Sequence, residues 1–138
     1  MVETTTKSKL YLQLADTKQS TTNDVVYCTK KFDIINPQYP EPVGYITLRV
    51  TENPAVIVYH GNVEYEVYKT FRGNGYAGIA CQMLKEEANK SGVANLWMTI
   101  IPDNNKSIKV CEKLGAFYCG SITKGKMQRK RYKLPVVT

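Results

Sequence analysis

Histidine is scarce in this sequence, and the cysteines are widely spaced. His60 is the sole histidine, so no site with two histidine ligands can form. No two cysteines follow the CxxC spacing of zinc ribbons and redox dithiols. His60 itself lies in His60-Gly61-Asn62 between two strand-like runs, which is typical of a turn. We therefore expect no metal site. The cysteines are Cys28, Cys81, Cys111 and Cys119.

Long apolar runs are also missing. No run approaches the roughly 20 residues that a membrane-spanning helix needs. No signal peptide follows Met1, and a disulfide framework is not expected in a chain with this much core and no secretory signal. These absences predict a cytoplasmic protein without a membrane segment.

What is present indicates a folded, basic domain. Hydrophobic residues make up 43% of the 138 residues, which excludes a disordered chain. The length fits one domain over residues 1–138, large enough to fold without a disulfide or a metal. Nineteen Lys and Arg against twelve Asp and Glu give a net charge of +7. That charge indicates an anionic partner: a nucleotide, a phosphate-bearing cofactor, nucleic acid or an acidic protein surface.

Strand patterns dominate the first half of the chain. Alternating or β-branched segments predict strands at residues 9–15, 25–35, 43–50, 55–59 and 63–68. The polar residues 16–24 predict a loop, and three prolines make residues 36–42 a connector. The last two strands are expected to form a hairpin around Gly61 and Asn62.

The second half of the chain alternates helices and strands. One helical face is formed by Ala77, Ala80, Cys81, Leu84 and Ala88, and Gly92 is placed to end that helix. The apolar residues 95–101 predict an interior strand. A second helix, capped by Asp103 or Asn104 and ended by Gly115, precedes a final strand pair at residues 116–122 and 127–136. This order predicts an α+β fold, a mixed sheet with helices on its faces.

The segment Arg72-Gly73-Asn74-Gly75-Tyr76-Ala77 follows a predicted strand and opens a predicted helix. Two glycines let the backbone turn tightly and bring its N–H groups against a ligand. The first turn of the helix adds unpaired donors and the positive end of the helix dipole, and Arg72 adds a charge. The pattern predicts a pyrophosphate-binding loop. The alternative is that the glycines only form a tight turn.

Residues 73–78 also fit G-x-G-x-x-G, the dinucleotide fingerprint. The strand before them, residues 64–69, is charged, whereas an interior parallel strand should be apolar. Only one further strand–helix unit follows, which is too little chain for a doubly wound sheet. A nicotinamide cofactor is therefore disfavoured.

Two motifs resemble those of the GNAT N-acetyltransferases. Residues 63–77, V-E-Y-E-V-Y-K-T-F-R-G-N-G-Y-A, are similar to the fourth strand and the R/Q-x-x-G-x-G/A loop of that family. Residues 104–117, N-N-K-S-I-K-V-C-E-K-L-G-A-F, are similar to its later N-x-x-S-x-x-x-x-x-K-L-G-x-F motif. That motif is common in the branch that acetylates ribosomal-protein N-termini and in many aminoglycoside and small-amine acetyltransferases. The resemblance runs from residue 43 to the C-terminus. It implies a mixed, mostly antiparallel twisted sheet with helices on both faces.

The resemblance implies acetyl-CoA as the cofactor and N-acetyl transfer to a primary amine by direct attack in a ternary complex. Backbone groups of Val67 and Tyr68 would pair with the pantetheine arm, which a splay between that strand and residues 95–101 would admit. The glycine loop would hold the pyrophosphate, and Asn104 would bind the pantetheine beside Ser107. The implied cofactor-binding residues are Val67, Tyr68, Arg72, Gly73, Asn74, Gly75, Tyr76, Ala77, Asn104 and Ser107.

Attack on a thioester requires an amine that has lost its proton, which calls for a carboxylate or a water chain. Glu64 and Glu66 are the candidate catalytic bases because they lie two residues apart, on one side of their strand. The alternative is that they form a solvated strand face; if the other side faces the cleft, Tyr65 points in instead. A backbone N–H near Val67 would stabilise the oxyanion by about 3 kcal/mol.

Two features depart from the family. Cys111 stands where the family often has a tyrosine general acid; a cysteine on a helix face is typical of core, and Tyr118 is the alternative acid. The polar residues 16–24 stand where the family carries two helices that wall the acceptor site. The first helical pair is therefore expected to be missing and the acceptor side open. That favours a protein or peptide acceptor, or a site completed by a second subunit in a homodimer.

A basic cluster near the C-terminus contains Lys124, Lys126, Arg129, Lys130, Arg131 and Lys133. Alternation places Arg129, Arg131 and Lys133 on one face of the last strand. The cluster is either a solvated edge or a docking face for an acidic partner or nucleic acid. Nucleic acid is not expected as a partner of an acetyltransferase. Two other functions stay open: an acyl-CoA-binding module without efficient turnover, and a basic domain that binds nucleic acid or protein.

Overall fold

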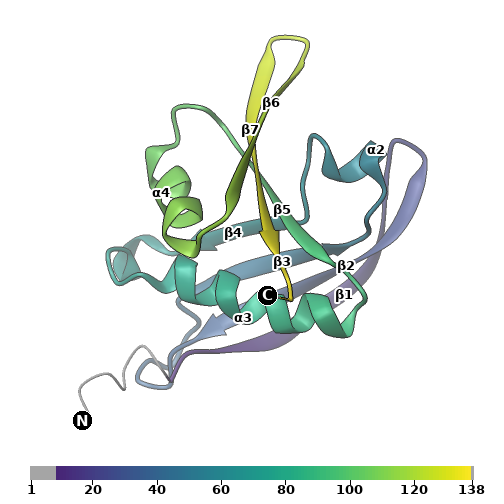
Figure 1. Cartoon of the computed structure of the whole chain (residues 1–138). Helices are drawn as coiled ribbons and strands as arrows, with labels where there is room; N and C mark the ends of the chain where they lie inside the picture. The colour runs from purple at the N-terminus through teal and green to yellow at the C-terminus, as the bar shows by residue number, and fades with distance from the viewer. Residues whose placement is uncertain (1–8, 138) are drawn as a thin grey trace.

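The computed structural model describes residues 9–137, and in this part of the chain seven strands form two antiparallel sheets (Figure 1). The first sheet has the order β1-β2-β3-β4, with β1 at Tyr11–Thr22, β2 at Val25–Ile35, β3 at Gly44–Val50 and β4 at Val63–Val67. The second has the order β5-β7-β6, with β5 at Asn95–Ile100, β6 at Phe117–Lys124 and β7 at Met127–Pro135. The helical elements are α2 at Pro54–Ile57, a 3₁₀ turn at Lys69–Phe71, α3 at Tyr76–Lys90 and α4 at Asn105–Leu114. The expected mixed, mostly antiparallel α+β fold is confirmed.

The ends of the two long helices follow the sequence signals. The Asn104 side chain caps α4 by accepting from the Ser107 N–H at 3.2 Å. Gly92 follows α3 with a φ of +78°, and Gly115 follows α4 with a φ of +77°. Both are left-handed conformations that glycine adopts without strain.

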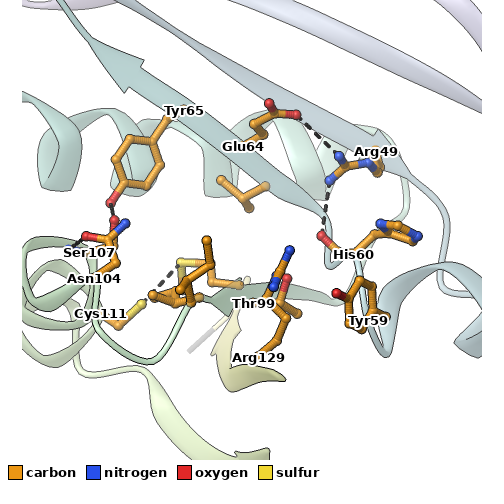
Figure 2. A pocket seen from close by; sticks show the side chains of 14 residues that line it. Arg49, Tyr59, His60, Glu64, Tyr65, Thr99, Asn104, Ser107, Cys111 and Arg129 are labelled. Carbon is orange, nitrogen blue, oxygen red and sulfur yellow. Dashed lines mark hydrogen bonds and ion pairs between the residues drawn. The ribbon is translucent and has the colours of Figure 1, made fainter. Parts of the chain in front are cut away.

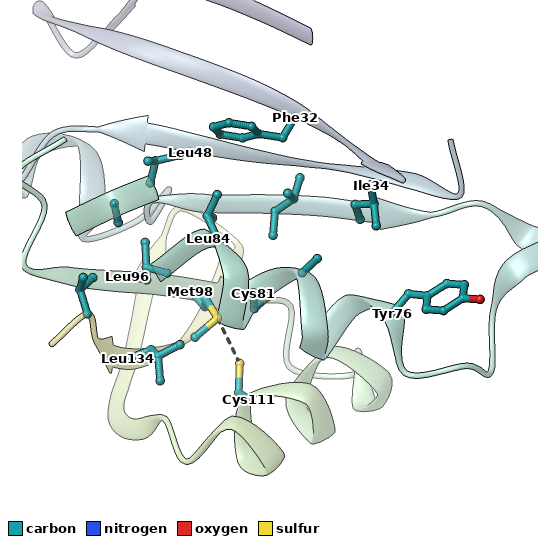
Figure 3. Packing of buried hydrophobic residues seen from close by; sticks show 14 of the residues in the cluster. Phe32, Ile34, Leu48, Tyr76, Cys81, Leu84, Leu96, Met98, Cys111 and Leu134 are labelled. Carbon is teal, nitrogen blue, oxygen red and sulfur yellow. Dashed lines mark hydrogen bonds between the residues drawn. The ribbon is translucent and has the colours of Figure 1, made fainter. Parts of the chain in front are cut away.

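Both long helices cover the same face of the sheets, where we expected helices on both faces. Cys81 of α3 and Cys111 of α4 belong to one buried cluster with Met98 of β5 (Figure 3). Cys111 Sγ lies 3.9 Å from Met98 Sδ. On β4, Tyr65 turns toward the same helices and donates to Ser107 Oγ at 3.0 Å. The opposite face of β1–β4 therefore carries neither of the two long helices of residues 9–137.

The polar residues 16–24 form a strand and a turn, and the loop we predicted there is wrong. β1 continues to Thr22, and only Asn23 and Asp24, with φ of +50° and +65°, turn the chain into β2. From residue 16 to residue 22, β1 is largely exposed on both faces, so the apolar alternation that predicts a strand at residues 9–15 does not continue there. The expectation of no helix between the first two strands is confirmed.

Residues 55–59 are not the first strand of a hairpin, as we predicted from their β-branched side chains. They belong to the short helix α2 and the turn after it. The Asn53 side chain accepts from the Ala55 N–H at 2.9 Å, and Pro54 occupies the first helical position. These capping residues outweigh the strand preference of Val56 and Ile57, which are buried.

The fully buried Asn62 joins the two sheets. Its backbone N–H donates to the Trp97 carbonyl of β5 at 2.7 Å, and its Oδ1 accepts from the Trp97 N–H at 3.0 Å. Its Nδ2 donates to the carbonyls of Arg49 and Thr51, both at 2.9 Å. Next to it, Gly61 has a φ of +68°, and a Cβ there would lie 2.5 Å from the Trp97 carbonyl oxygen. Only glycine permits this approach of β5.

We predict that Asn62→Ala lowers the free energy of unfolding by about 3 kcal/mol, because it leaves two carbonyls and one N–H buried without partners. Urea unfolding followed by circular dichroism measures the loss. Asn89→Ala, on the exposed side of α3, is the matched control and should change stability by less than about 0.5 kcal/mol. A decrease in the free energy of unfolding below about 1 kcal/mol for Asn62→Ala would show that water replaces the hydrogen bonds of the Asn62 side chain.

Candidate functional site

Two cavities meet in the opening between β4 and β5. The first, here the glycine-loop cavity, has a volume of about 530 Å³ and lies between the loop at residues 71–78, β4 and α4. The second, here the Arg129 cavity, has a volume of about 480 Å³ and lies among β4, β5, the segment after α2 and Arg129 (Figure 2). Tyr65, Asn104 and Ser107 line both cavities. A ligand in one cavity can therefore reach a ligand in the other at these three residues.

The edge of β4 that faces this opening carries free backbone groups. Arg49 N–H donates to the Asn62 carbonyl at 2.8 Å, and Tyr68 N–H donates to the Val43 carbonyl at 2.9 Å. Because antiparallel pairs alternate, the odd-numbered residues between them, Val67 included, point their N–H and C=O away from β3. The splay that we expected between β4 and β5 is thus present, with unpaired groups on its β4 side.

Val67 and Tyr68 differ in what their backbones can offer. The Tyr68 carbonyl accepts from the Phe71 N–H at 2.8 Å, so both of its backbone groups are used within the chain. The Val67 carbonyl accepts from Arg72 Nε at 2.8 Å, and its N–H faces the opening. Of these two residues, only Val67 therefore has a backbone N–H that faces the opening, and the pairing we expected from Tyr68 would compete with existing bonds.

The glycine loop presents N–H groups to its cavity. Gly73 and Gly75 have φ of +88° and +74°, and α3 begins directly after Gly75. The first N–H groups of a helix have no partner within it, which leaves those of residues 76–78 to face the loop. The Tyr76 side chain is buried and accepts from Asn36 Nδ2 at 2.9 Å, so the residue directly after β2 holds the start of the helix in place. Lys106 adds positive charge to the cavity wall, where Arg72 lies paired with Glu66. The arrangement suits a phosphate-bearing ligand.

Tyr65 and Ser107 form a directed pair where the cavities meet (Figure 2). The Tyr65 hydroxyl donates to Ser107 Oγ, which leaves the hydroxyl hydrogen of Ser107 free to donate onward. Burial raises the pKa of Tyr65 to about 12, although the bond to Ser107 opposes the rise. Tyr65 therefore stays protonated at neutral pH. Asn104 uses its Oδ1 as the helix cap, and its Nδ2 remains available at the same junction.

Glu64 and Glu66 lie on the opposite side of β4 from Tyr65, and each is paired with an arginine. Glu64 lines the Arg129 cavity, with Oε1 3.3 Å from Arg49. Glu66 lines the glycine-loop cavity, with Oε2 3.7 Å from Arg72. Of the two glutamates, only Glu64 thus adjoins the Arg129 cavity. The spacing in the sequence does not distinguish Glu64 from Glu66, but the structure does.

The other candidate acids lie in different settings. Cys111 borders the Arg129 cavity, but it is 1% exposed and packs in the core, and burial raises the pKa of its thiol to about 12. Tyr118 is 56% exposed, hydrogen-bonded to Ser121 and outside both cavities. His60 lies in a turn, as its sequence context indicated, and its backbone carbonyl accepts from Arg49 at 3.2 Å.

Sequence reasoning missed Tyr59 and Arg129 as residues of the site. The sequence places Tyr59 in a predicted strand and Arg129 on one face of the last strand, within a cluster of six basic residues, and connects neither to the site. Arg129 Cζ lies 4.9 Å from the centre of the Tyr59 ring, across 70 residues of chain. No local signal in the sequence connects them. Among residues 9–137, no group of three or more His, Cys, Asp or Glu side chains could hold a metal ion. In the same residues, every helix is too short or too polar to cross a membrane.

Comparison with protein families finds that a family model described as an acetyltransferase (GNAT) domain matches residues 4–116. A search of curated protein sequences finds no match.

Solved structures share the fold at low sequence identity. RimJ of Mycobacterium smegmatis, in complex with CoA-disulfide, is 19% identical with a TM-score of 0.63, over 78% of this chain and 53% of that chain. AAC(6')-Ib, in complex with ribostamycin and coenzyme A, is 18% identical with a TM-score of 0.62, over 78% of this chain and 64% of that chain. A spermidine N-acetyltransferase SpeG variant of Vibrio cholerae is 12% identical with a TM-score of 0.70, over 94% of this chain and 95% of that chain. The chain thus spans between half and two-thirds of the first two structures.

We predict that Cys111 and Cys81 resist iodoacetamide in the folded protein at pH 8, where Cys119, which is exposed, is alkylated. Burial raises the pKa of both buried thiols to about 12. At pH 8 only about one in 10⁴ of such groups is the reactive thiolate. Mass spectrometry of proteolytic peptides reads out each site, and the urea-unfolded protein is the control in which all four react. Rapid alkylation of Cys111 in the folded state would contradict its assignment to the core.

Proposed function

Because the chain belongs to the GNAT acetyltransferase family, we propose that it transfers an acetyl group from acetyl-CoA to a primary amine bound in the Arg129 cavity. The observation that carries this proposal is the meeting of the two cavities at Tyr65, Asn104 and Ser107. One cavity suits a phosphate-bearing ligand, and the other adjoins a carboxylate that can act as a base. A transfer reaction between two bound reactants needs both, with their reacting groups in contact.

The residues of the glycine-loop cavity fit acetyl-CoA. The unpaired N–H groups of the loop and the first turn of α3 suit a pyrophosphate, with Arg72 and Lys106 beside them. Phe71 and Val110 supply apolar wall, and the Asn104 amide and the Val67 N–H suit the polar groups of the pantetheine arm. We propose that these residues hold the cofactor with its thioester at the junction. When bound there, acetyl-CoA supplies the acetyl group, whose C–S bond breaks as the C–N bond to the amine forms.

The chain's own groups handle the protons and the developing charge. Glu64 accepts the amine proton, directly or through water. The Val67 N–H donates to the carbonyl oxygen as negative charge develops there. Ser107, whose oxygen accepts from Tyr65, would donate a hydrogen bond to the departing sulfur, which leaves as a thiolate. This arrangement assigns no role to the buried Cys111 thiol.

We further propose a protein or peptide as the acceptor. The face of β1–β4 opposite the long helices is polar and open, with a cavity of about 440 Å³ that runs on from Arg49 and Glu64 toward Lys18 and Lys31. A small amine finds few enclosing groups there, so binding energy must come from a wider surface.

We predict that Gly75→Val abolishes coenzyme A binding measured by calorimetry. A β-branched side chain is strained at a φ of +74° and would crowd the loop's approach to phosphate. Gly92→Val is the matched control, because Gly92 has a φ of +78° and lies at the far end of α3. Both variants should lose similar stability, and only Gly75→Val should lose the ligand. Unchanged affinity in Gly75→Val would remove the cofactor from this loop.

We predict that Glu64→Gln lowers kcat at neutral pH about 100-fold while coenzyme A affinity is retained. Glu66→Gln is the matched control on the same strand. Its carboxylate adjoins Arg72, so its loss should change the KM for acetyl-CoA more than kcat. Release of the coenzyme A thiol measures kcat and KM for both variants. If both single variants and the double variant turn over at the wild-type rate, neither glutamate is the base. Water or the substrate itself would then take the proton of the amine. Coenzyme A binding without turnover on any amine would favour a binding module.

A further inference from the structure

Two cations of the β6–β7 hairpin stack on one aromatic ring at the rim of the Arg129 cavity. Lys124 Nζ lies 5.4 Å and Arg129 Cζ 4.9 Å from the centre of the Tyr59 ring. Stacking fixes both side chains while leaving their charges accessible. Neither side chain takes part in an ion pair with a carboxylate of residues 9–137. We call Lys124 and Arg129 the basic rim.

The basic rim faces a cavity whose carboxylate, that of Glu64, forms an ion pair with an arginine. Glu64 is paired with Arg49, so the positive charge of the rim is in excess. The pKa of His60 is lowered from its ordinary value, first by burial and then by the positive charges of Arg49, Lys124 and Arg129. Glu64 and Arg129 lie on opposite sides of the cavity in Figure 2. An acceptor amine at Glu64 would therefore have the basic rim beyond it.

A second basic row continues along β7 on the same face. Arg131 Cζ lies 4.4 Å and Lys133 Nζ 6.0 Å from the centre of the Trp97 ring. Arg131 Nε is buried and has no hydrogen-bond partner. Charges two residues apart on a strand are spaced by about 7 Å, as are alternate side chains of an extended peptide. The surface thus matches a chain that carries repeated negative charge.

We infer that the acceptor is an acidic peptide segment, with one or more Asp or Glu residues next to its reactive amine, bound by the basic rim. This inference rests on the proposed acetyl transfer and names its substrate class. Polycationic acceptors are disfavoured because each additional ammonium group would meet Lys124 and Arg129. Nucleic acid also carries repeated negative charge but lacks a primary alkyl amine, whereas a peptide has one at its N-terminus and on each lysine.

The test compares matched decapeptides that each carry a free N-terminus and one lysine. In one peptide, Asp and Glu residues flank both amines. In the other peptide, Asn and Gln take the places of these Asp and Glu residues. We expect the acidic peptide to have a kcat/KM at least tenfold higher in wild-type protein, and Arg129→Gln to remove most of that preference. Lys126→Gln, in the turn of the same hairpin, is the control with the same loss of charge and should keep the preference. Arg129→Glu should reverse the preference in kcat/KM, so that a lysine-rich peptide becomes a better acceptor than the acidic peptide.

Binding provides a readout that does not need turnover. Fluorescence anisotropy of both labelled peptides, with and without coenzyme A, should show the same order of affinity and the same loss in Arg129→Gln. Equal affinities and equal rates for the two peptides would overturn the inference, as would a higher kcat/KM for spermidine or an aminoglycoside. Tighter retention on single-stranded DNA than on the acidic peptide would assign the basic rim to nucleic acid. If coenzyme A binds and a cationic amine is acetylated, only the inference fails; if coenzyme A does not bind, the proposed function fails.

Discussion

The site depends on a single buried asparagine that joins two sheets at one end and lets them diverge at the other. The Asn62 side-chain amide donates to the Arg49 carbonyl, a bond that its own backbone N–H would make in a regular ladder. That N–H is then free to bond Trp97 of β5. Beyond this point β4 follows β3 and parts from β5, and the opening holds both cavities. Unpaired strand edges are a liability in most proteins, whereas here they provide the donors of the site.

The placement of both long helices on one face explains why the two cavities differ in character. α3 and α4 pack against the apolar face, so the glycine-loop cavity at their N-terminal ends is bordered by helix donors and by apolar wall. The Arg129 cavity opens toward the polar face, where arginine, glutamate and tyrosine side chains line it. The two cavities thus draw on different faces of the sheet, although Tyr65, Asn104 and Ser107 line both.

Local sequence signals predicted the parts of the fold that depend on local chemistry. The limits of α3 and α4 followed from Gly92, Asn104 and Gly115, and the glycine loop from its position between strand and helix. Alternation predicted only the first part of β1, because the part from residue 16 to residue 22 is largely exposed on both faces and does not alternate. The partition of Glu64 and Glu66 between the cavities and the stacking of Arg129 on Tyr59 depend on tertiary contacts, which periodicity does not encode.

The register of β4 ties the stability of the protein to the geometry of its site. Tyr65 pairs with the fully buried Ile46 and faces the helices, while Glu64 and Glu66 face the other side. A slip of one residue would turn a carboxylate into the core beside Ile46 and move Tyr65 out to solvent. Burying an unpaired carboxylate costs several kcal/mol, a large fraction of the stability of a domain of this size. The same packing that excludes the slipped register therefore fixes which side chain meets Ser107 and which carboxylate adjoins the Arg129 cavity, so the core specifies how these side chains are arranged around the cavity.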